Sequence, residues 1–265
     1  MDSLAGNQYQ SLGGLILLAG KWYPCGVARF SAKSAVQQIR KRFAELGDPE
    51  RAAFEKAYLK SDLRFHGVSV PQIRAEAAAF TKAQPELAAD ELRGFVEALF
   101  ASDYHDLRSL GIAVLERRRA LLSARDLDWL LGLVRTARNW AHVDWLATKV
   151  IGPLVQSSPR CGALLQRWGR DPELWVRRTA LLAQLDALRA GGGDFALFAQ
   201  IAAPLLAEKE FFIRKAIGWV LRDVSKKRPD LSAAFLLEHR DRASGLTLRE
   251  GAKYLPAATR AKLFA

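Results

Sequence analysis

The sequence predicts an all-α protein in which antiparallel helix pairs stack into a curved solenoid with a concave face. Three observations support this fold class. From Ser34 onward, apolar residues recur at helical spacing, and no segment alternates with period two over a convincing length. The predicted helices are short and are joined by short turns, which is typical of antiparallel pairs. One pair takes up roughly 35–45 residues, the spacing of HEAT-like helical repeats.

A leader, residues 1–32, precedes the helical part and differs from it. Its apolar run, Leu15–Leu18, lies among glycines and has neither a basic region before it nor a cleavage site after it. A secretory signal peptide needs both features, so we expect a strand-like or poorly packed segment instead. No motif in the leader indicates a role. We expect residues 33–265 to form a single HEAT-like helical repeat domain.

Capping residues place the first helices. Ser34 can cap a helix that runs to Leu46. Asp48 and Pro49 suit the N-cap and first turn of the next helix, and the segment 67–71 turns the chain into a third. The later predicted helices are periodic or bounded by Gly, Pro, Ser or Asp, and span 88–101, 104–121, 126–137, 140–156, 159–168, 173–189, 194–207, 210–227, 230–239, 246–254 and 257–263.

The composition favours a polyanionic partner. The chain has 265 residues, with 40 Lys plus Arg against 28 Asp plus Glu, a formal net charge of +12 and a pI near 10. Such a field attracts nucleic acid or an anionic membrane surface. No apolar run is long enough to span a bilayer, and the cationic helices need their apolar faces for packing, so we expect no membrane partner.

Cysteine and histidine usage predicts no metal site and no cofactor. Cys25 and Cys161 are far apart, and we interpret both as free thiols in a reducing cytoplasm. There is no glycine-rich phosphate loop and no Gly-x-Ser-x-Gly motif. The histidines are scattered and form no ligand spacing: His66, His105, His142 and His239.

The segment 139–149 holds the first candidate site residues. Trp140 and Asp144 are four residues apart, so on a helix they lie on one face. A carboxylate in the middle of a helix beside an indole has no capping duty. It can be a structural Asp held by a neighbouring helix, or a functional group, and these residues alone leave both interpretations open.

Two later helices carry cations and indoles that fit a nucleic-acid groove. Lys215, Trp219, Arg222 and Lys226 are spaced four, three and four, which puts them on one stripe of a helix. Cations in such a stripe pair with phosphates, and an aromatic ring among them can lie against sugar or base. A solvated basic face with one Trp in the core is the other interpretation. The earlier helix carries Trp175, Arg177 and Arg178.

Several motifs, in this order, resemble the AlkD-like DNA alkylation repair glycosylases over roughly residues 34–255. The segment around Trp219 is the most specific. The motifs are Tyr58-Leu-Lys-Ser, Gly67-Val-Ser-Val-Pro71 with Arg74, the Trp-x-x-x-Asp of Trp140 and Asp144, Trp175-Val-Arg-Arg-Thr-Ala180, and Glu210-Phe-Phe-Ile-Arg-Lys-Ala-Ile-Gly-Trp-Val-Leu-Arg222 followed by Ser225, Lys226 and Pro229.

The resemblance implies a HEAT-like solenoid that grips duplex DNA in its concavity and removes cationic alkylated purines such as 3-methyladenine and 7-methylguanine. By position, Asp144 matches the catalytic aspartate. Trp140, Trp219 and Arg178 match the active-site cleft, the arginine as a DNA contact, and Tyr58 matches a tyrosine near the DNA. We add a DNA-binding expectation for the cations Arg177, Lys215, Arg222 and Lys226.

These residue types suit cleavage of an N-glycosidic bond. A cationic purine is already a good leaving group, and positive charge develops on the deoxyribose as the bond breaks. A carboxylate such as Asp144 can stabilise that charge and orient or deprotonate a water. No lysine is placed as a Schiff-base nucleophile, so we expect a monofunctional glycosylase. The lesion need not be flipped, because the sequence shows no sign of a deep base pocket or wedge.

Two alternatives stay open. The first is a non-catalytic module of the same fold that binds bent or branched DNA, which would need no carboxylate at Asp144. The second is a HEAT protein-interaction scaffold, which should lack the cluster of Trp and cations on its inner face. We expect a bacterial-type cytoplasmic protein, associated with the nucleoid when bound to DNA and acting as a monomer.

Overall fold

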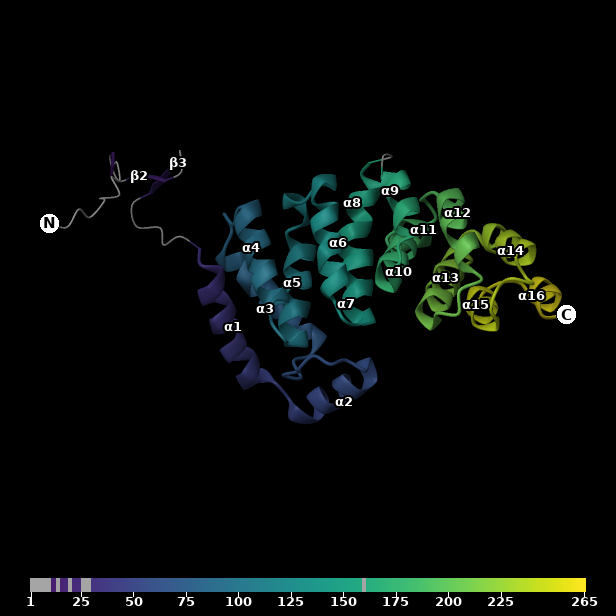
Figure 1. The fold of residues 1–265 in the computed structure, drawn as a ribbon, viewed down its shortest axis with the longest axis horizontal. Coiled ribbons are helices and arrows are strands. Elements are labelled where there is room, and N and C mark those ends of the chain that lie inside the picture. Colours follow the sequence, from purple (N-terminus) through teal and green to yellow (C-terminus); the bar gives the residue numbers. More distant parts are fainter. Residues whose placement is uncertain (1–10, 13–14, 19–20, 25–29, 159–160) are drawn as a thin grey trace.

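The computed structural model describes residues 11–12, 15–18, 21–24, 30–158 and 161–265. In the leader, three short strands pair antiparallel in the order β1 (Ser11–Leu12), β2 (Leu15–Leu18) and β3 (Lys21–Pro24). Cys25 lies outside the described residues. From Ala32 onward, every named element of the described chain is a helix, which confirms the predicted fold class (Figure 1).

The helices succeed one another with short connections. The first part consists of α1 (Ala32–Leu46), α2 (Pro49–Leu59), α3 (Val70–Ala83), α4 (Ala89–Phe100), α5 (His105–Arg117), two 3-10 turns (Arg119–Leu121 and Ala124–Asp126) and α6 (Leu127–Thr136). The second part consists of α7 (Trp140–Trp145), a π-helical segment (Leu146–Ile151), α8 (Gly152–Gln156), α9 (Cys161–Trp168), α10 (Leu174–Leu182), α11 (Leu185–Arg189), α12 (Phe195–Leu205), α13 (Phe211–Val224), α14 (Pro229–Glu238), α15 (Gly245–Gly251) and α16 (Ala257–Phe264).

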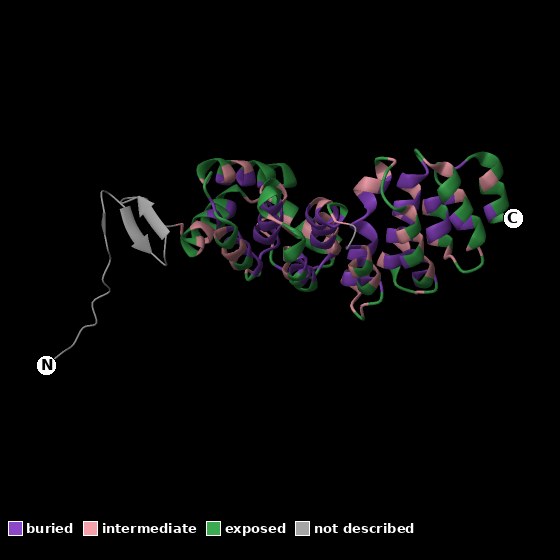
Figure 2. Ribbon diagram, turned by 90° about the horizontal axis from the view of Figure 1, so that it is seen from above, coloured by how far each residue is buried: buried purple, intermediate pink, exposed green. Residues whose placement is uncertain are grey.

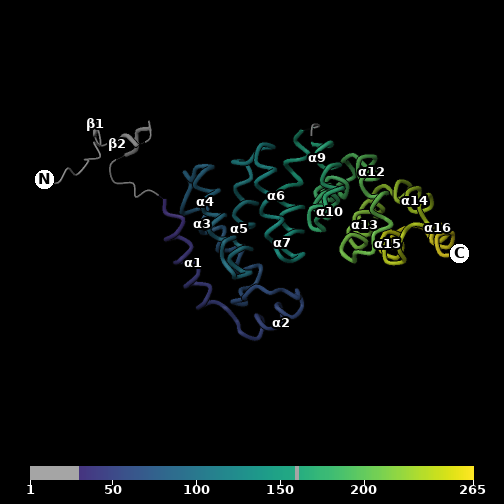
Figure 3. Tube along the Cα trace, in the orientation of Figure 1, coloured from purple at the N-terminus to yellow at the C-terminus, as the bar shows by residue number. Residues whose placement is uncertain are grey.

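The helices form a curved solenoid that runs from α1 at one end to α16 at the other. Figure 3 shows α2 set apart from the row, below α3, α5 and α7. Buried residues run along the whole length of the solenoid (Figure 2). They form one continuous apolar cluster that reaches from Ile39 to Leu263. This continuity supports our proposal that residues 33–265 are a single domain.

A recurring hydrogen bond marks the repeat. Arg108, Arg177 and Arg214 each donate to the backbone carbonyl six residues earlier, at 2.8, 2.8 and 2.7 Å. At the corresponding position of another repeat, the ring of His142 lies 3.2 Å from the carbonyl oxygen of Ala137. The four positions are 34, 35 and 37 residues apart. Each side chain fastens a helix to the turn that precedes it, at the period expected for HEAT-like pairs.

Local sequence explains the first helix boundaries. Asp48 caps α2 by accepting hydrogen bonds from the amides of Glu50 and Arg51 at 2.9 and 3.1 Å, as predicted. The prediction that Ser34 caps α1 was wrong. Ser31 takes that place, and its hydroxyl accepts from the amide of Ser34 at 3.3 Å. A helix therefore begins three residues earlier than the periodic pattern indicates.

The predicted continuous helix over 140–156 is interrupted by the π-helical segment. Pro153 has no amide hydrogen, so it cannot donate to the carbonyl of Lys149 four residues earlier. Arg119 supplies a donor instead, with its Nη1 at 3.3 Å from that carbonyl oxygen. The predicted helix over 173–189 is likewise two helices, α10 and α11, separated at residues 183–184. The predicted helix over 104–121 ends at Arg117. The start of the predicted helix 159–168, residues 159–160, lies outside the described residues.

Candidate active site

The start of α7 positions the predicted Trp140 and Asp144. Asn139 is the N-cap, and its side chain accepts a hydrogen bond from the amide of His142 at 3.1 Å. Trp140 is the first residue of the helix and Asp144 lies one turn further along, so both project from the same face. The two side chains therefore lie on one face of a helix, as the sequence predicts.

Arg178 of α10 binds Asp144 in a bidentate arrangement. Its Nε and Nη2 donate to the two carboxylate oxygens at 2.6 and 2.8 Å. Its Nη1 donates to the backbone carbonyl of Phe212, at the start of α13. One guanidinium group thus joins three successive repeats, and two parallel charge-assisted bonds fix the plane of the carboxylate.

The Asp144 carboxylate is buried but retains access to solvent. Its side chain is 13% exposed, whereas that of Arg178 is 3% exposed. Burial raises the pKa of Asp144 above its usual range, and the hydrogen bonds and charge of Arg178 offset only part of that rise. Arg178 was expected to contact DNA. Its observed partners are Asp144 and the Phe212 carbonyl, so it lies behind the carboxylate and orients it.

Tyr58 brings α2 against the start of α7. Its ring meets that of Trp140 edge to face, with centroids 5.7 Å apart. Phe54 stacks on Tyr58 with centroids 6.2 Å apart and planes inclined by 2°. Both residues are well exposed, Phe54 at 69% and Tyr58 at 62%. Phe54 was not among the predicted site residues, although its spacing of four from Tyr58 is the signal for such a pair.

Trp219 lies half-buried on α13 against the apolar core. Its indole Nε1 donates to Oδ2 of Asp223, one turn further along, at 3.1 Å. Phe212, which contacts Arg178, lies two turns before Trp219 on the same helix, a rise of about 10 Å. The two predicted indoles, Trp140 and Trp219, therefore belong to helices that Arg178 ties together.

The predicted basic stripe is paired with carboxylates, and the helix predicted over 210–227 ends at Val224, so Lys226 lies in the turn after α13. Lys215 and Arg222 both bind Glu250 of α15, the latter at 2.7 Å, and Lys226 binds Asp223 at 2.8 Å. The sequence left two interpretations open, cations that bind phosphates or a solvated basic face. Neither of them included these carboxylate partners. The cations stay partly open to solvent, with side chains 37%, 24% and 45% exposed. They are held in place and partly neutralised.

Arg177 has structural partners. Its Nη1 donates to the carbonyls of Asp171 and Pro172 at 2.8 Å each, and its Nη2 donates to Glu208 at 3.1 Å. The side chain is 14% exposed. Of the cations predicted to bind DNA, it is therefore the one most committed to holding a turn of the solenoid.

A buried polar cluster lies behind the start of α7. The hydroxyl of Ser109 is 3.3 Å from Nε2 of His105 and 3.0 Å from Nε2 of His142, and the two imidazole rings stack at 4.2 Å. Desolvation lowers the pKa of His105 to about 4 and that of His142 well below its usual range, so both rings are neutral near pH 7. The cluster supports the N-cap Asn139 from within. The scattered spacing of the histidines in sequence gave no sign of it.

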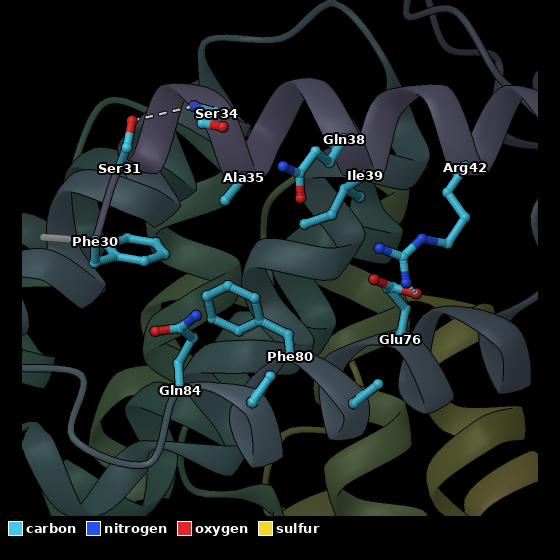
Figure 4. Close-up of a pocket in the computed structure, with 12 residues that line it drawn as sticks. Phe30, Ser31, Ser34, Ala35, Gln38, Ile39, Arg42, Glu76, Phe80 and Gln84 are labelled. Atoms are coloured by element: carbon cyan, nitrogen blue, oxygen red, sulfur yellow. Dashed lines mark hydrogen bonds and ion pairs between the residues drawn. The ribbon is translucent and has the colours of Figure 1, made fainter. Parts of the chain in front are cut away.

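Other features lie away from Asp144. A cavity of about 550 Å³ between α1 and α3 is bordered by Phe30, Ile39, Phe80 and the ion pair of Arg42 and Glu76 (Figure 4). Among the described residues, no group of three His, Cys, Asp or Glu side chains is arranged to hold a metal ion. No helix in the described part of the chain has the length and apolar character to cross a membrane.

Comparison with known proteins gives a family match over most of the chain. Residues 39–255 match the family model of "DNA alkylation repair enzyme". A predicted DNA alkylation repair enzyme from Enterococcus faecalis is 26% identical, with a TM-score of 0.72 over 80% of this chain and 97% of that one. The crystal structure of AlkD2 from Streptococcus mutans shares the fold at 17% identity, with a TM-score of 0.60 over 86% and 100%. A search of curated proteins finds no match.

Proposed function

Since this chain belongs to the family of DNA alkylation repair enzymes, we propose that it is a monofunctional DNA glycosylase acting on cationic alkylated purines, such as 3-methyladenine and 7-methylguanine, in duplex DNA. The observation that carries the proposal is the Asp144 carboxylate, which Arg178 holds by two hydrogen bonds and which keeps 13% of its side chain exposed. That access lets the carboxylate face a bound substrate while the arginine fixes its plane.

The geometry suits stabilisation of a sugar cation. As the N-glycosidic bond breaks, positive charge develops at C1′ of the deoxyribose, and the purine leaves without needing a proton. Asp144 stabilises this charge and orients the attacking water. Burial raises the pKa of Asp144, and Arg178 acts against that rise, which favours the anionic form, while its two hydrogen bonds hold the carboxylate in one plane. The arginine therefore acts through the aspartate.

Aromatic rings on both sides complete the proposed cleft. In this proposal Trp140 and Trp219 flank the sugar and exclude bulk water, and Tyr58 supports Trp140 through their edge-to-face contact. The π faces of the indoles also attract a cationic nucleotide. Lys215, Arg222 and Lys226 are partly exposed and bind backbone phosphates in exchange for part of their contact with Glu250 and Asp223. The protein acts as a monomer on nucleoid DNA in the cytoplasm.

Excision from methylated duplex DNA tests the proposal. Wild-type protein should release 3-methyladenine and 7-methylguanine, leave an abasic site, and give no strand break trapped by borohydride. Asp144→Asn keeps the size of the side chain but loses its charge, and should lower the rate on the order of a hundredfold or more. Asp241→Asn, at an exposed turn, is the matched control and should act like wild type. Equal rates for wild type and Asp144→Asn would refute the mechanism.

Two further outcomes separate the alternatives. Salt-dependent DNA binding without any excision would show a non-catalytic binding module, whereas the absence of DNA binding would favour a protein-interaction scaffold. The lesion is processed without full flipping in our proposal, so bulky 7-alkyl adducts should also be released. A snug base pocket would reject them.

A further inference from the structure

Asp223 is a buried anion placed directly behind Trp219. The two residues are one turn apart on α13, and Oδ2 of Asp223 accepts the hydrogen bond from the indole Nε1 at 3.1 Å. The side chain of Asp223 is 3% exposed, whereas the indole is only half-buried. The carboxylate is therefore almost inaccessible to solvent, but it is hydrogen-bonded to a ring that is partly exposed to solvent.

Two cations, one from α11 and one from the turn after α13, hold the carboxylate itself. Arg189 of α11 donates to Oδ2 from Nε at 2.9 Å and from Nη2 at 2.7 Å, and Lys226 donates to Oδ1 at 2.8 Å. Although burial alone would raise it, these bonds keep the pKa of Asp223 below its usual range. Asp223 is therefore ionised, and every polar contact it makes is charge-assisted or directed to the indole.

The contacts on Asp223 limit how Trp219 can move. An indole has a single donor, and turning the ring about its bond to Cβ would carry Nε1 away from the carboxylate. Lys226 is restrained from a second side as well, because its ammonium lies 5.1 Å from the centre of the Tyr254 ring. One buried carboxylate thus determines the orientation of a half-exposed ring and of a partly exposed cation beside it.

We propose that Asp223 is a positioning residue, which holds the Trp219 indole in the orientation that the reaction needs and keeps Lys226 next to it. The proposal rests on the proposed glycosylase function, in which Trp219 flanks the sugar. Asp223 does not touch the substrate. Its effect should therefore be on the rate of the chemical step and only weakly on binding, because a misplaced flanking group costs transition-state stabilisation.

A double-mutant cycle tests the coupling. Asp223→Leu removes the acceptor without leaving a cavity, and Trp219→Phe keeps a ring but removes the donor. We expect each to lower kcat about tenfold with KM changed less than about threefold, and the double variant to lose little more than Asp223→Leu alone. Asp223→Asn keeps one oxygen for the indole and should restore part of the rate. Multiplicative losses in the double variant would overturn the proposal.

Two controls separate a positioning role from a structural one. Asp186 of α11 also binds Arg189, at 3.1 Å, but not Trp219, so Asp186→Leu should leave kcat within about twofold of wild type. The indole NH resonance of Trp219, assigned from its loss in Trp219→Phe, should shift in Asp223→Leu and stay near its wild-type position in Asp186→Leu. An unshifted resonance in folded Asp223→Leu would contradict the hydrogen bond.

The activity of wild-type protein keeps the two proposals distinct. If wild-type protein excises no alkylated purine, the glycosylase function fails and Asp223 has no reaction to serve. If wild-type protein is active and the Asp223→Leu and Trp219→Phe losses are independent, only the positioning role fails. Should Asp223→Leu not fold, Trp219→Phe and Asp223→Asn are compared instead. Asp223→Asn can at most weaken the hydrogen bond that Trp219→Phe removes, so its loss in kcat should be no larger, and a larger loss would overturn the proposal.

Discussion

Asp144 and Arg178, 34 residues apart in sequence, form a bidentate ion pair that links α7 to α10. This finding satisfies both sequence-based interpretations of Asp144. The carboxylate is held by a neighbouring helix, as a structural residue would be, and it retains access to solvent, as a functional residue must. The same arginine donates to the Phe212 carbonyl at the start of α13, so one side chain links the three helices that carry the proposed site.

The acid side of the pH–rate profile for excision should depend on the ion pair of Asp144 and Arg178. Asp144 must be anionic to act, so activity falls as the pH drops through its pKa, which burial places above the usual range. Arg178→Gln removes the interaction that lowers this pKa, and the acid limb should move to higher pH. Single-turnover rates on 7-methylguanine DNA, corrected for release without protein, measure the shift. Arg177→Gln is the neighbouring control, and the same shift in both variants would contradict the assignment.

Glu250 should weaken DNA binding in the wild type, because it neutralises Lys215 and Arg222. Although burial acts in the opposite direction, these two cations hold the pKa of Glu250 below its usual range, so it is ionised. Glu250→Gln should therefore bind undamaged duplex more tightly and with a steeper salt dependence, by up to about two units of log–log slope. Glu238→Gln makes the same charge change at a side chain that is 74% exposed. Identical slopes in both variants would argue against a DNA role for these cations.

The neutral histidine pair should make the fold sensitive to acid. The pKa of His105 is about 4 in the folded protein against an ordinary value of 6.5, so the unfolded chain binds the proton first. Stability is fully present above pH 6.5 and is lost as the pH falls toward 4. The contribution of His105 is at most about 3 kcal/mol. Urea unfolding of wild type and His105→Gln across this range measures it. The variant should show a flatter pH dependence, and an unchanged slope would count against burial as the cause.

Gly152 should be intolerant of a side chain. A Cβ at this position would lie 2.7 Å from the carbonyl oxygen of Ala183, where α8 meets the break between α10 and α11. Gly152→Ala should therefore cost about 1–3 kcal/mol of unfolding free energy. Gly132, in the middle of α6, has open space around the same atom. Gly132→Ala should stabilise the protein by up to about 1 kcal/mol, through helix propensity. Thermal unfolding of the two variants provides the comparison, and a stable Gly152→Ala protein would contradict this packing.

The helical repeat and the shared helical face of Trp140 and Asp144 could be predicted from the sequence, because these signals are local. Apolar spacing reports the buried face of a helix, Asp48 reports a cap, and Trp140 with Asp144 reports one helical face. Interruptions of the helices were harder to predict. The continuous helix predicted over 140–156 overlooked Pro153, and the donor that reaches the Lys149 carbonyl is Arg119, 30 residues earlier in the chain.

By itself, the sequence determined that the chain is a helical solenoid with a carboxylate, indoles and cations at defined positions. Only the tertiary structure decided the partners of these groups. Arg178 faces Asp144 instead of open solvent, Glu250 partly neutralises Lys215 and Arg222, and His105 of the preceding repeat lies beside Asn139. The physical reason is that a charged side chain pairs with whatever the adjacent repeat places opposite it. That neighbour lies about 35 residues away along the chain, and only the packing of one helix pair on the next brings it into contact.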